Sequence, residues 1–251
     1  MSDLLKVSNL RKGNILKDID FAVQEGEMTA VMGPSGSGKS TLLYNVSGMD
    51  TPDAGEVYLG GTEITGLSED EKAELRLKRM GFVFQQMNML EHLNIIDNIA
   101  LPAVHADRKR RKEYYDRARA LMDAFHIGDL AERKVNEVSG GQLQRACICR
   151  SMMMEPDIIF ADEPTGALNQ TAASEVTESF LRINGEGATI LMVTHDSGIA
   201  AMCEIVKTNV ANTIKQNMVA FFNGTKTVEA DYDAFLSDLE AQGLGKLVEM
   251  Y

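Results

Sequence analysis

A glycine-rich loop with the pattern G-x-x-x-x-G-K-[ST] directly follows an apolar run at residues 28–32. Backbone N–H groups of such a loop surround phosphate oxygens, and glycine lets the chain come close to the anion. Lys39 is expected to contact the β- and γ-phosphates, and the Ser40 hydroxyl to bind Mg²⁺. An ordinary glycine- and serine-rich turn is the alternative, but the strand before the loop and the helical pattern after it favour nucleotide binding. The loop residues are Gly33, Pro34, Ser35, Gly36, Ser37, Gly38, Lys39, Ser40 and Thr41.

Two adjacent carboxylates, Asp162 and Glu163, follow a second apolar run at residues 158–161. Ligands of open α/β sheets gather at the carboxyl ends of the strands, so we expect both acids to lie beside the nucleotide. Asp162 suits the Mg²⁺ shell, and Glu163 can polarise a water for attack on the γ-phosphate. Adjacent acids are also common on protein surfaces, and it is the phosphate loop that favours the functional interpretation.

Two further polar side chains end predicted strands. Gln85 follows residues 81–84 and can hold Mg²⁺ or the attacking water. His195 follows a strand at residues 190–193, and its imidazole can donate a hydrogen bond to the γ-phosphate. The other histidines are interpreted as structural; they are His92, His105 and His126.

A second glycine-rich helix start lies far along the chain, at Ser139, Gly140, Gly141 and Gln142. A helix N-terminus of this kind can bind an anion, but Ser139 is equally well explained as a simple N-cap. One triphosphate does not need two such sites from one chain unless two chains pair.

Strands and helices alternate before residue 86 and again after residue 156, whereas residues 86–150 have a helical pattern. The alternation predicts an α/β fold, a P-loop NTPase core with a parallel sheet and an inserted α-helical subdomain at about residues 86–150. Glycines on either side of residues 56–59 predict a small antiparallel β subdomain. Within the insert, Pro102 is expected to separate two helices.

The helix that follows Ser139 is expected to run to about Met154 and to end at Glu155-Pro156. Near the C-terminus, a last strand pair is expected at residues 219–222 and 225–228. Residues 229–251 are predicted to form a tail helix.

Composition excludes several classes of protein. The formal net charge of −12 over 251 residues argues against a nucleic-acid binder. The one basic run, residues 108–112, is interpreted as a solvated helix face. The three cysteines lack C-x-x-C spacing and are expected to be reduced thiols. No apolar run is as long as a membrane span, and the N-terminus does not resemble a signal peptide, so we expect a soluble, intracellular chain.

Taken in series, the motifs GPSGSGKST, the Gln after GFVF, VSGGQLQR, IIFADEPTGAL and MVTHD resemble the ATPase subunit of an ABC transporter. The details around residues 79–85, 98–102 and 161–168 resemble the branch that serves lipoprotein release, macrolide efflux and antimicrobial-peptide resistance. The resemblance covers residues 1–203, and it implies ATP and Mg²⁺ as ligands and an ATP-binding domain over residues 1–228.

The resemblance also implies partners. Ser139 and Gly141 would contact the γ-phosphate held by a second protomer, in a homodimer or a heterodimer with a related ATPase that encloses ATP. A coupling helix of an integral membrane permease would dock near residues 85–99. The flexible apolar residues within this range would suit such docking, although about half of them are equally well explained as part of the hydrophobic core. This apolar set consists of Met87, Met89, Leu90, Leu93, Ile95 and Ile96.

Three details depart from the family pattern. The aromatic residue that stacks on adenine is absent from residues 10–14, where Arg11 is the candidate to stack instead. Asn169 stands where aspartate is usual; it can cap a helix but would lose a charge contact across the interface. Residues 207–218 are longer and more polar than the usual return to the last strand pair.

Two functions of different class fit this pattern. The first is an energy-coupling ATPase, peripheral on the cytoplasmic face of the cell membrane, that drives a separate permease for efflux or extraction of a peptide, lipoprotein or hydrophobic compound. The second is a soluble ABC-type mechanical or regulatory ATPase. Proteins of the second class usually carry two ATPase modules, long coiled coils or basic surfaces, and this sequence shows a single module and an acidic balance. We therefore expect the first.

Overall fold

The structure is a computed structural model that describes residues 3–34, 36–195 and 204–205. The described residues divide into two compact units. We call residues 24–28 and 66–192 the helical unit, and the remaining described residues the phosphate-loop unit. The predicted features at residues 207–218, 219–228 and 229–251 lie outside the described residues.

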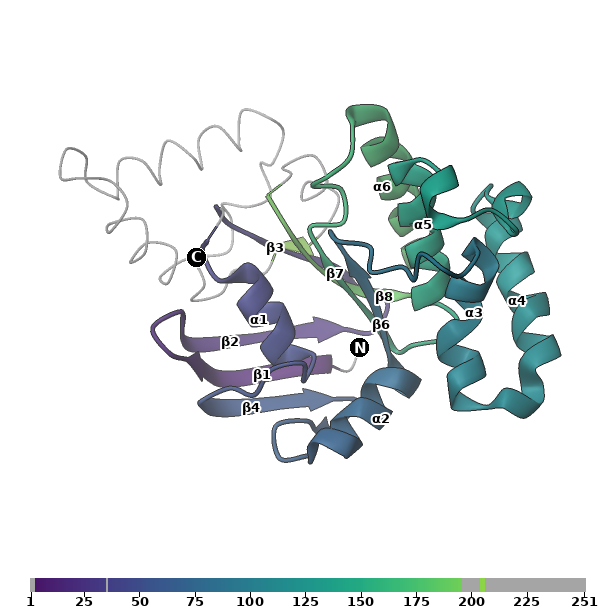
Figure 1. The fold of residues 1–251 in the computed structure, drawn as a ribbon. Helices are drawn as coiled ribbons and strands as arrows, with labels where there is room; N and C mark the ends of the chain where they lie inside the picture. The colour runs from purple at the N-terminus through teal and green to yellow at the C-terminus, as the bar shows by residue number, and fades with distance from the viewer. Residues whose placement is uncertain (1–2, 35, 196–203, 206–251) are drawn as a thin grey trace. The chain divides into compact units, whose positions relative to one another are not determined.

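The phosphate-loop unit contains an antiparallel sheet with the strand order β2-β1-β4-β5 (Figure 1). In this sheet β1 and β4 are antiparallel, with Val7 opposite Val57. Gly55 of β4 has φ 96°, and a Cβ there would lie 2.5 Å from the carbonyl oxygen of Asn9, so only glycine allows the two strands to come this close. The strands are β1 (Asp3–Lys12), β2 (Leu16–Gln24), β4 (Ala54–Leu59) and β5 (Thr62–Glu63).

The same unit carries the strand and helix on either side of the phosphate loop. Strand β3 (Met28–Met32) precedes the loop and pairs in parallel with β9 (Glu204–Ile205). Helix α1 (Lys39–Val46) follows the loop, and Gly48 just beyond its end has φ 67°, the left-handed conformation that ends many helices.

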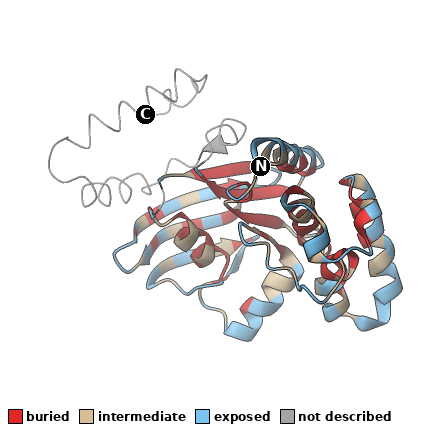
Figure 2. Ribbon diagram, turned by 45° about the horizontal axis from the view of Figure 1, so that its top comes forward, coloured by how far each residue is buried: buried red, intermediate tan, exposed pale blue. Residues whose placement is uncertain are grey.

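The helical unit contains the strands β6 (Met80–Phe84) and β7 (Ile158–Asp162) and most of β8 (Thr189–Thr194), which are neighbours in that order. β6 and β7 are parallel, with Phe84 opposite Asp162. Every residue of β7 and β8 is buried, and Figure 2 shows parallel-sheet strands in red along their length. Strands buried on both faces are expected where helices cover a parallel sheet, and they explain the continuous apolar runs in the sequence.

The chain between β6 and β7 forms no strand and is mainly helical. Its helices are α3 (Ile95–Ala106), η1 (Arg108–Arg110), α4 (Arg111–Ala124), η2 (Gly128–Leu130), η3 (Val135–Glu137) and α5 (Gly140–Ser151). Two more helices of the unit flank this region in sequence, α2 (Glu69–Arg79) and α6 (Gln170–Gly185). In the part of the chain that the structure describes, no helix is both long enough and apolar enough to cross a bilayer.

Arginine side chains tie several of these helices together by donating to backbone carbonyls. Arg117 of α4 donates to the carbonyl oxygens of Met152 and Met153, at 3.0 and 3.2 Å, just beyond the end of α5. Arg182 of α6 donates to the last carbonyl of α4. A guanidinium has donors in a fixed fork and satisfies the carbonyls that a helix end leaves without intrahelical partners.

Two expectations were wrong. Pro102 does not separate two helices but lies inside α3, where buried side chains on the same helix keep the segment helical although proline removes one hydrogen bond. Helix α5 ends at Ser151, before the predicted Met154, because the chain turns at residues 152–154. In the apolar set near Gln85, for which surface and core were both open, Ile95 and Ile96 lie in the core, each 1% exposed.

Candidate functional site

The phosphate loop has the backbone that anion binding requires. Gly36 and Gly38 have φ 80° and 95°, in the left-handed region where a residue with a Cβ is strained. A Cβ on Gly38 would also lie 2.6 Å from the side chain of Ile15, so this position has no room for another residue. Ser35 lies outside the described residues. The remaining loop residues therefore form a turn whose shape depends on glycine and which leads directly into the N-terminus of α1.

Lys39 is held inside the loop by backbone oxygens. Its ammonium group donates to the carbonyls of Gly33 and Pro34 at 2.8 and 3.1 Å, and the residue is 6% exposed. Among the described residues, the hydroxyl of Ser37 is buried without a hydrogen-bond partner. A buried hydroxyl without a hydrogen-bond partner is costly, and phosphate oxygens could accept its hydrogen bond. The loop residues thus fit a bound polyphosphate.

In the helical unit, the structure brings Gln85 together with the two predicted acids. Asp162 ends β7 and is 7% exposed, and Glu163 follows it with φ 46°. Because Phe84 lies opposite Asp162, Gln85 leaves β6 at the level where Glu163 leaves β7. A Cβ on Gly166 would lie 3.0 Å from Nε2 of Gln85, so the amide lies against the turn that starts at Glu163.

The glycine-rich start of α5 is closed by a reciprocal cap. The Ser139 hydroxyl accepts from the backbone N–H of Gln142 at 3.3 Å, and the Gln142 side chain accepts from the backbone N–H of Ser139 at 2.9 Å. The N-cap interpretation of Ser139 is therefore confirmed, and its contact with an anion stays a prediction. Gly141 has a packing reason as well, since a Cβ there would lie 2.8 Å from Cβ of Ala172 in α6.

The remaining predicted positions are placed as follows. His195 follows the last residue of β8, in the phosphate-loop unit. Asn169 caps α6 by accepting from the backbone N–H of Ala172 at 2.9 Å, as expected of an asparagine there. Arg11, the candidate to stack on a base, forms a 2.5 Å ion pair with Asp18.

Sequence reasoning missed the side chains that hold the stretch around Gln85. Gln144 and Arg150 of α5 donate to backbone carbonyls of this stretch, and Asn98 of α3 exchanges hydrogen bonds with the backbone of Leu90 at 2.7 and 3.0 Å. Gln144 and Asn98 are fully buried. The sequence did contain a signal for these contacts, namely polar residues among apolar ones in a helix, because a polar side chain that is buried needs a hydrogen-bond partner.

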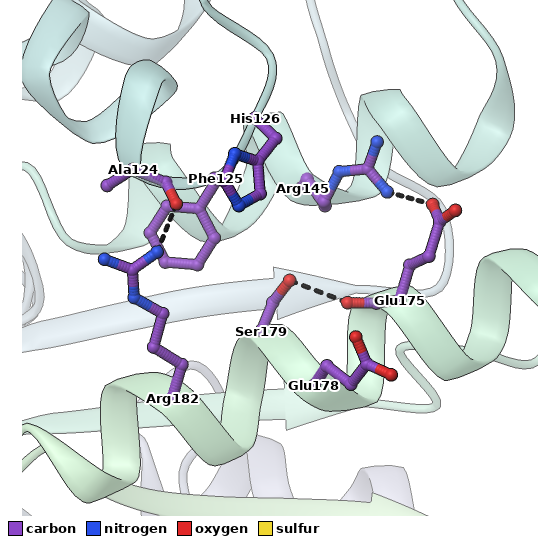
Figure 3. A pocket seen from close by; sticks show the side chains of 8 residues that line it. All are labelled: Ala124, Phe125, His126, Arg145, Glu175, Glu178, Ser179 and Arg182. Carbon is purple, nitrogen blue, oxygen red and sulfur yellow. Dashed lines mark hydrogen bonds and ion pairs between the residues drawn. The ribbon is translucent and has the colours of Figure 1, made fainter.

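A separate pocket of about 320 Å³, lined by both polar and apolar groups, lies within the helical unit (Figure 3). Arg145 forms an ion pair with Glu175 at one side, and at the other Arg182 lies over the ring of Phe125, 5.6 Å from its centroid. None of the predicted site residues lines it. Its lining residues are Ala124, Phe125, His126, Arg145, Glu175, Glu178, Ser179 and Arg182.

Comparison with known proteins agrees with these features. Residues 16–166 match the ABC transporter family. The chain is 41% identical over 188 residues to the macrolide export ATP-binding/permease protein MacB of Bdellovibrio bacteriovorus, covering 75% of this chain and 28% of MacB. It is 39% identical over 197 residues to the lipoprotein-releasing system ATP-binding protein LolD 1 of Chlorobium chlorochromatii, covering 78% of this chain and 80% of LolD 1. The chain thus spans roughly three tenths of the MacB relatives and most of LolD 1.

The fold agrees as well. The ATP-binding cassette MJ0796, solved as a dimer in a post-hydrolysis state with ADP and Pi, is 34% identical, with a TM-score of 0.70 over 80% of this chain and 92% of that one. The cassette cbiO1 of the cbiONQ transporter complex from Clostridium perfringens has a TM-score of 0.72 at 27% identity, over 80% of this chain and 82% of that one. The predicted α/β class with a parallel sheet and an antiparallel β subdomain is confirmed. The chain belongs to the ABC transporter family and carries its ATP-binding, ATP-hydrolysing domain.

Proposed function

We propose that this chain is the ATPase subunit that powers a separate membrane permease, for efflux or extraction of a peptide, a lipoprotein or a hydrophobic compound. The match to LolD 1 over 80% of that protein's length carries the proposal, because its name describes an ATP-binding protein of a lipoprotein-releasing system. The name of MacB, which combines ATP binding and a permease in macrolide export, supports the same class of substrate.

The residues near β6 and β7 have the chemistry that Mg²⁺ and hydrolysis need. Mg²⁺ prefers oxygen ligands, and we assign this role to the Ser40 hydroxyl, the Gln85 amide oxygen and the Asp162 carboxylate. When bound, the ion neutralises phosphate charge. Glu163 orients and polarises the attacking water. The proximity of Gln85 to the turn that begins at Glu163 supports this assignment.

For ATP itself we assign the backbone N–H groups of residues 33–41 other than Pro34, and the Lys39 ammonium, to the phosphates, and His195 to the γ-phosphate. The glycine conformations of the loop support the first assignment. The capped start of α5 at Ser139, Gly140, Gly141 and Gln142 would bind the γ-phosphate of ATP held by a partner protomer, in a homodimer or a heterodimer with a related ATPase. The dimeric form of the MJ0796 cassette supports this arrangement.

We further propose that the permease docks near residues 85–99 and that the chain lies at the cytoplasmic face of the membrane. With Ile95 and Ile96 in the core, the docking surface reduces to four residues. Met87, Met89 and Leu93 are half-buried, and Leu90 is 41% exposed. In this proposal the ATP-binding domain spans residues 1–228, with the helical subdomain at about 86–150 and a tail helix at 229–251.

Copurification tests the proposal. A tagged chain, expressed with its neighbouring open reading frames and extracted in detergent, should bring down a polytopic membrane protein. Leu90→Asp should abolish this capture because it places a charge in the docking surface. Leu101→Asp is the matched control, since Leu101 on α3 is also an exposed leucine at 39%. Capture of soluble proteins alone, or equal capture by both variants, would contradict the proposal.

A further inference from the structure

Arg150 binds the backbone that directly follows Gln85. One terminal nitrogen of its guanidinium donates to the carbonyl oxygen of Met87 at 2.8 Å, and the other to that of Asn88 at 2.9 Å. Asn88 has φ 48°, so the backbone bends sharply where Arg150 holds it. A single side chain therefore fixes two consecutive carbonyls, two and three residues beyond Gln85.

Two further side chains of α5 bind the same stretch. Gln144 donates to the carbonyl of Phe84 at 3.2 Å, and the thiol of Cys147 lies 3.4 Å from the carbonyl of Met87. Gln144, Cys147 and Arg150 are each three residues apart, which places them on one face of the helix. Carbonyls before and after Gln85 are thus tied to one face of α5.

The opposite end of α5 is the capped turn at Ser139 to Gln142. From Gln142 to Arg150 the helix rises about 12 Å, at 1.5 Å per residue. Because α5 is continuous between these points, the position of the Ser139 turn and the position of Gln85 are linked through one rigid element.

We propose that Arg150 is a positioning residue for hydrolysis, because it holds the Gln85 amide in a fixed relation to the helix that carries the Ser139 turn. The inference rests on the proposed function, in which Gln85 binds Mg²⁺ or the attacking water. Arg150 acts through the backbone and touches neither nucleotide nor metal. Loss of the two hydrogen bonds from the Arg150 guanidinium leaves the phosphate loop intact but lets Gln85 move.

The first test uses Arg150→Met, which keeps an unbranched apolar stem, and Arg150→Lys, which keeps the charge but replaces the rigid planar fork with a single ammonium group on a flexible stem. For Arg150→Met we expect kcat to fall about tenfold or more, KM for ATP to stay within about twofold, and the Mg²⁺ concentration for half-maximal rate to rise several-fold. Arg150→Lys should be intermediate, and it keeps the test available if Arg150→Met does not fold.

Arg117→Met is the matched control for stability. Arg117 also donates to two backbone carbonyls of the chain around α5, those of Met152 and Met153, but these carbonyls do not belong to the stretch that follows Gln85. It should lower the melting temperature about as much as Arg150→Met while kcat stays within about twofold. If Arg117→Met lowers kcat as far as Arg150→Met, or if Arg150→Met keeps its kcat, the proposal is overturned.

A double-mutant cycle separates this inference from the proposed function. If Arg150 acts through Gln85, adding Arg150→Met to Gln85→Ala should cost little further activity. If the two substitutions instead lower the activity by independent factors that multiply in the double variant, Arg150 acts elsewhere than through Gln85. A Gln85→Ala variant with normal kcat would overturn both the role of Gln85 and the inference, whereas the role of Glu163 and the permease partner are tested by other variants and would stand.

Discussion

Glu163 has a backbone conformation that is uncommon for a residue with a side chain. Its φ of 46° turns the chain just after Asp162, the last residue of β7. A non-glycine residue in this region costs free energy that the surroundings must offset, and such conformations cluster at functional sites. The strain supports the assignment of Glu163 to water activation.

Glu163→Gln should therefore leave ATP binding near normal while kcat falls by about two orders of magnitude or more, the scale expected for loss of a general base. The amide keeps the shape of the side chain but is not basic. Calorimetric titration measures binding, and phosphate release measures hydrolysis. Hydrolysis near the wild-type rate would remove Glu163 from this role.

The thiols of α5 illustrate how burial controls reactivity. Burial raises the pKa of Cys147 to about 11, and burial and the neighbouring Cys147 raise the pKa of Cys149 further. A raised pKa means that folding favours the neutral thiol. This stabilising contribution is complete below the ordinary pKa near 9 and is lost as pH rises through the folded-state value.

In a Cys203→Ser variant, a thiol reagent at pH 8 should therefore label the native protein far more slowly than the unfolded protein. The free energy of unfolding should also fall above about pH 9, and this fall should be smaller when Cys147 and Cys149 are replaced by alanine. Rapid labelling of native Cys147 or Cys149 would contradict the burial of both.

At the level of elements, α3 shows how packing overrides a helix breaker. Pro102 lies inside the helix and cannot donate to the carbonyl of residue 98. Ile99, Ala100 and Ala103 of the same helix are fully buried, and their packing offsets the lost hydrogen bond.

Pro102→Ala should raise the free energy of unfolding by about 2–3 kcal/mol. The restored N–H and the relief of the ring clash favour the variant by roughly 3 kcal/mol, and the greater freedom of its unfolded chain takes back up to about 1 kcal/mol. Urea unfolding measures the change. Leu101→Ala, at the exposed neighbouring position, should shift stability by less than about 0.5 kcal/mol. An unchanged or less stable Pro102→Ala would mean that α3 has adapted to the proline.

At the level of the whole molecule, the proposed dimer makes each ATP site depend on two chains. The phosphate loop with Lys39 and the capped turn with Ser139 would then bind the same nucleotide from opposite protomers, in a two-fold interface. Lys39→Ala removes a phosphate contact, and Ser139→Arg fills the turn with a large cation.

Each homodimeric variant should be inactive because every site carries one lesion. A mixed dimer of the two variants has one site with both lesions and one site with neither, so mixing should restore part of the ATPase activity. The assay is phosphate release, with the membrane partner present if dimerisation needs it. A dimer that still hydrolyses ATP with Ser139→Arg on both chains would exclude the shared site.

The features that sequence predicted well are those that depend on nearby residues. The caps at Ser139 and Asn169 form as their patterns indicate, because each involves residues within three positions along the chain. Contacts between distant residues could not be predicted in this way. Arg150 and Asn88 are 62 positions apart, and no local pattern in the sequence pairs them.

The sequence left the burial of Ile95 and Ile96 open for the same reason. Both are apolar and follow a stretch that is partly exposed, so the sequence alone fits a docking surface and a core equally well. Which of the two applies depends on the helices that pack against α3, and these follow in the chain at α4 and α5.

The contacts of Arg150 have a consequence for how this chain can evolve. The acceptors at Met87 and Asn88 are main-chain oxygens, which every amino acid supplies. Selection can therefore exchange the outward side chains of this stretch without altering the path of its backbone. A lineage that acquires a different binding partner can change the side chains of the recognition surface while the path of the backbone that Arg150 holds stays the same.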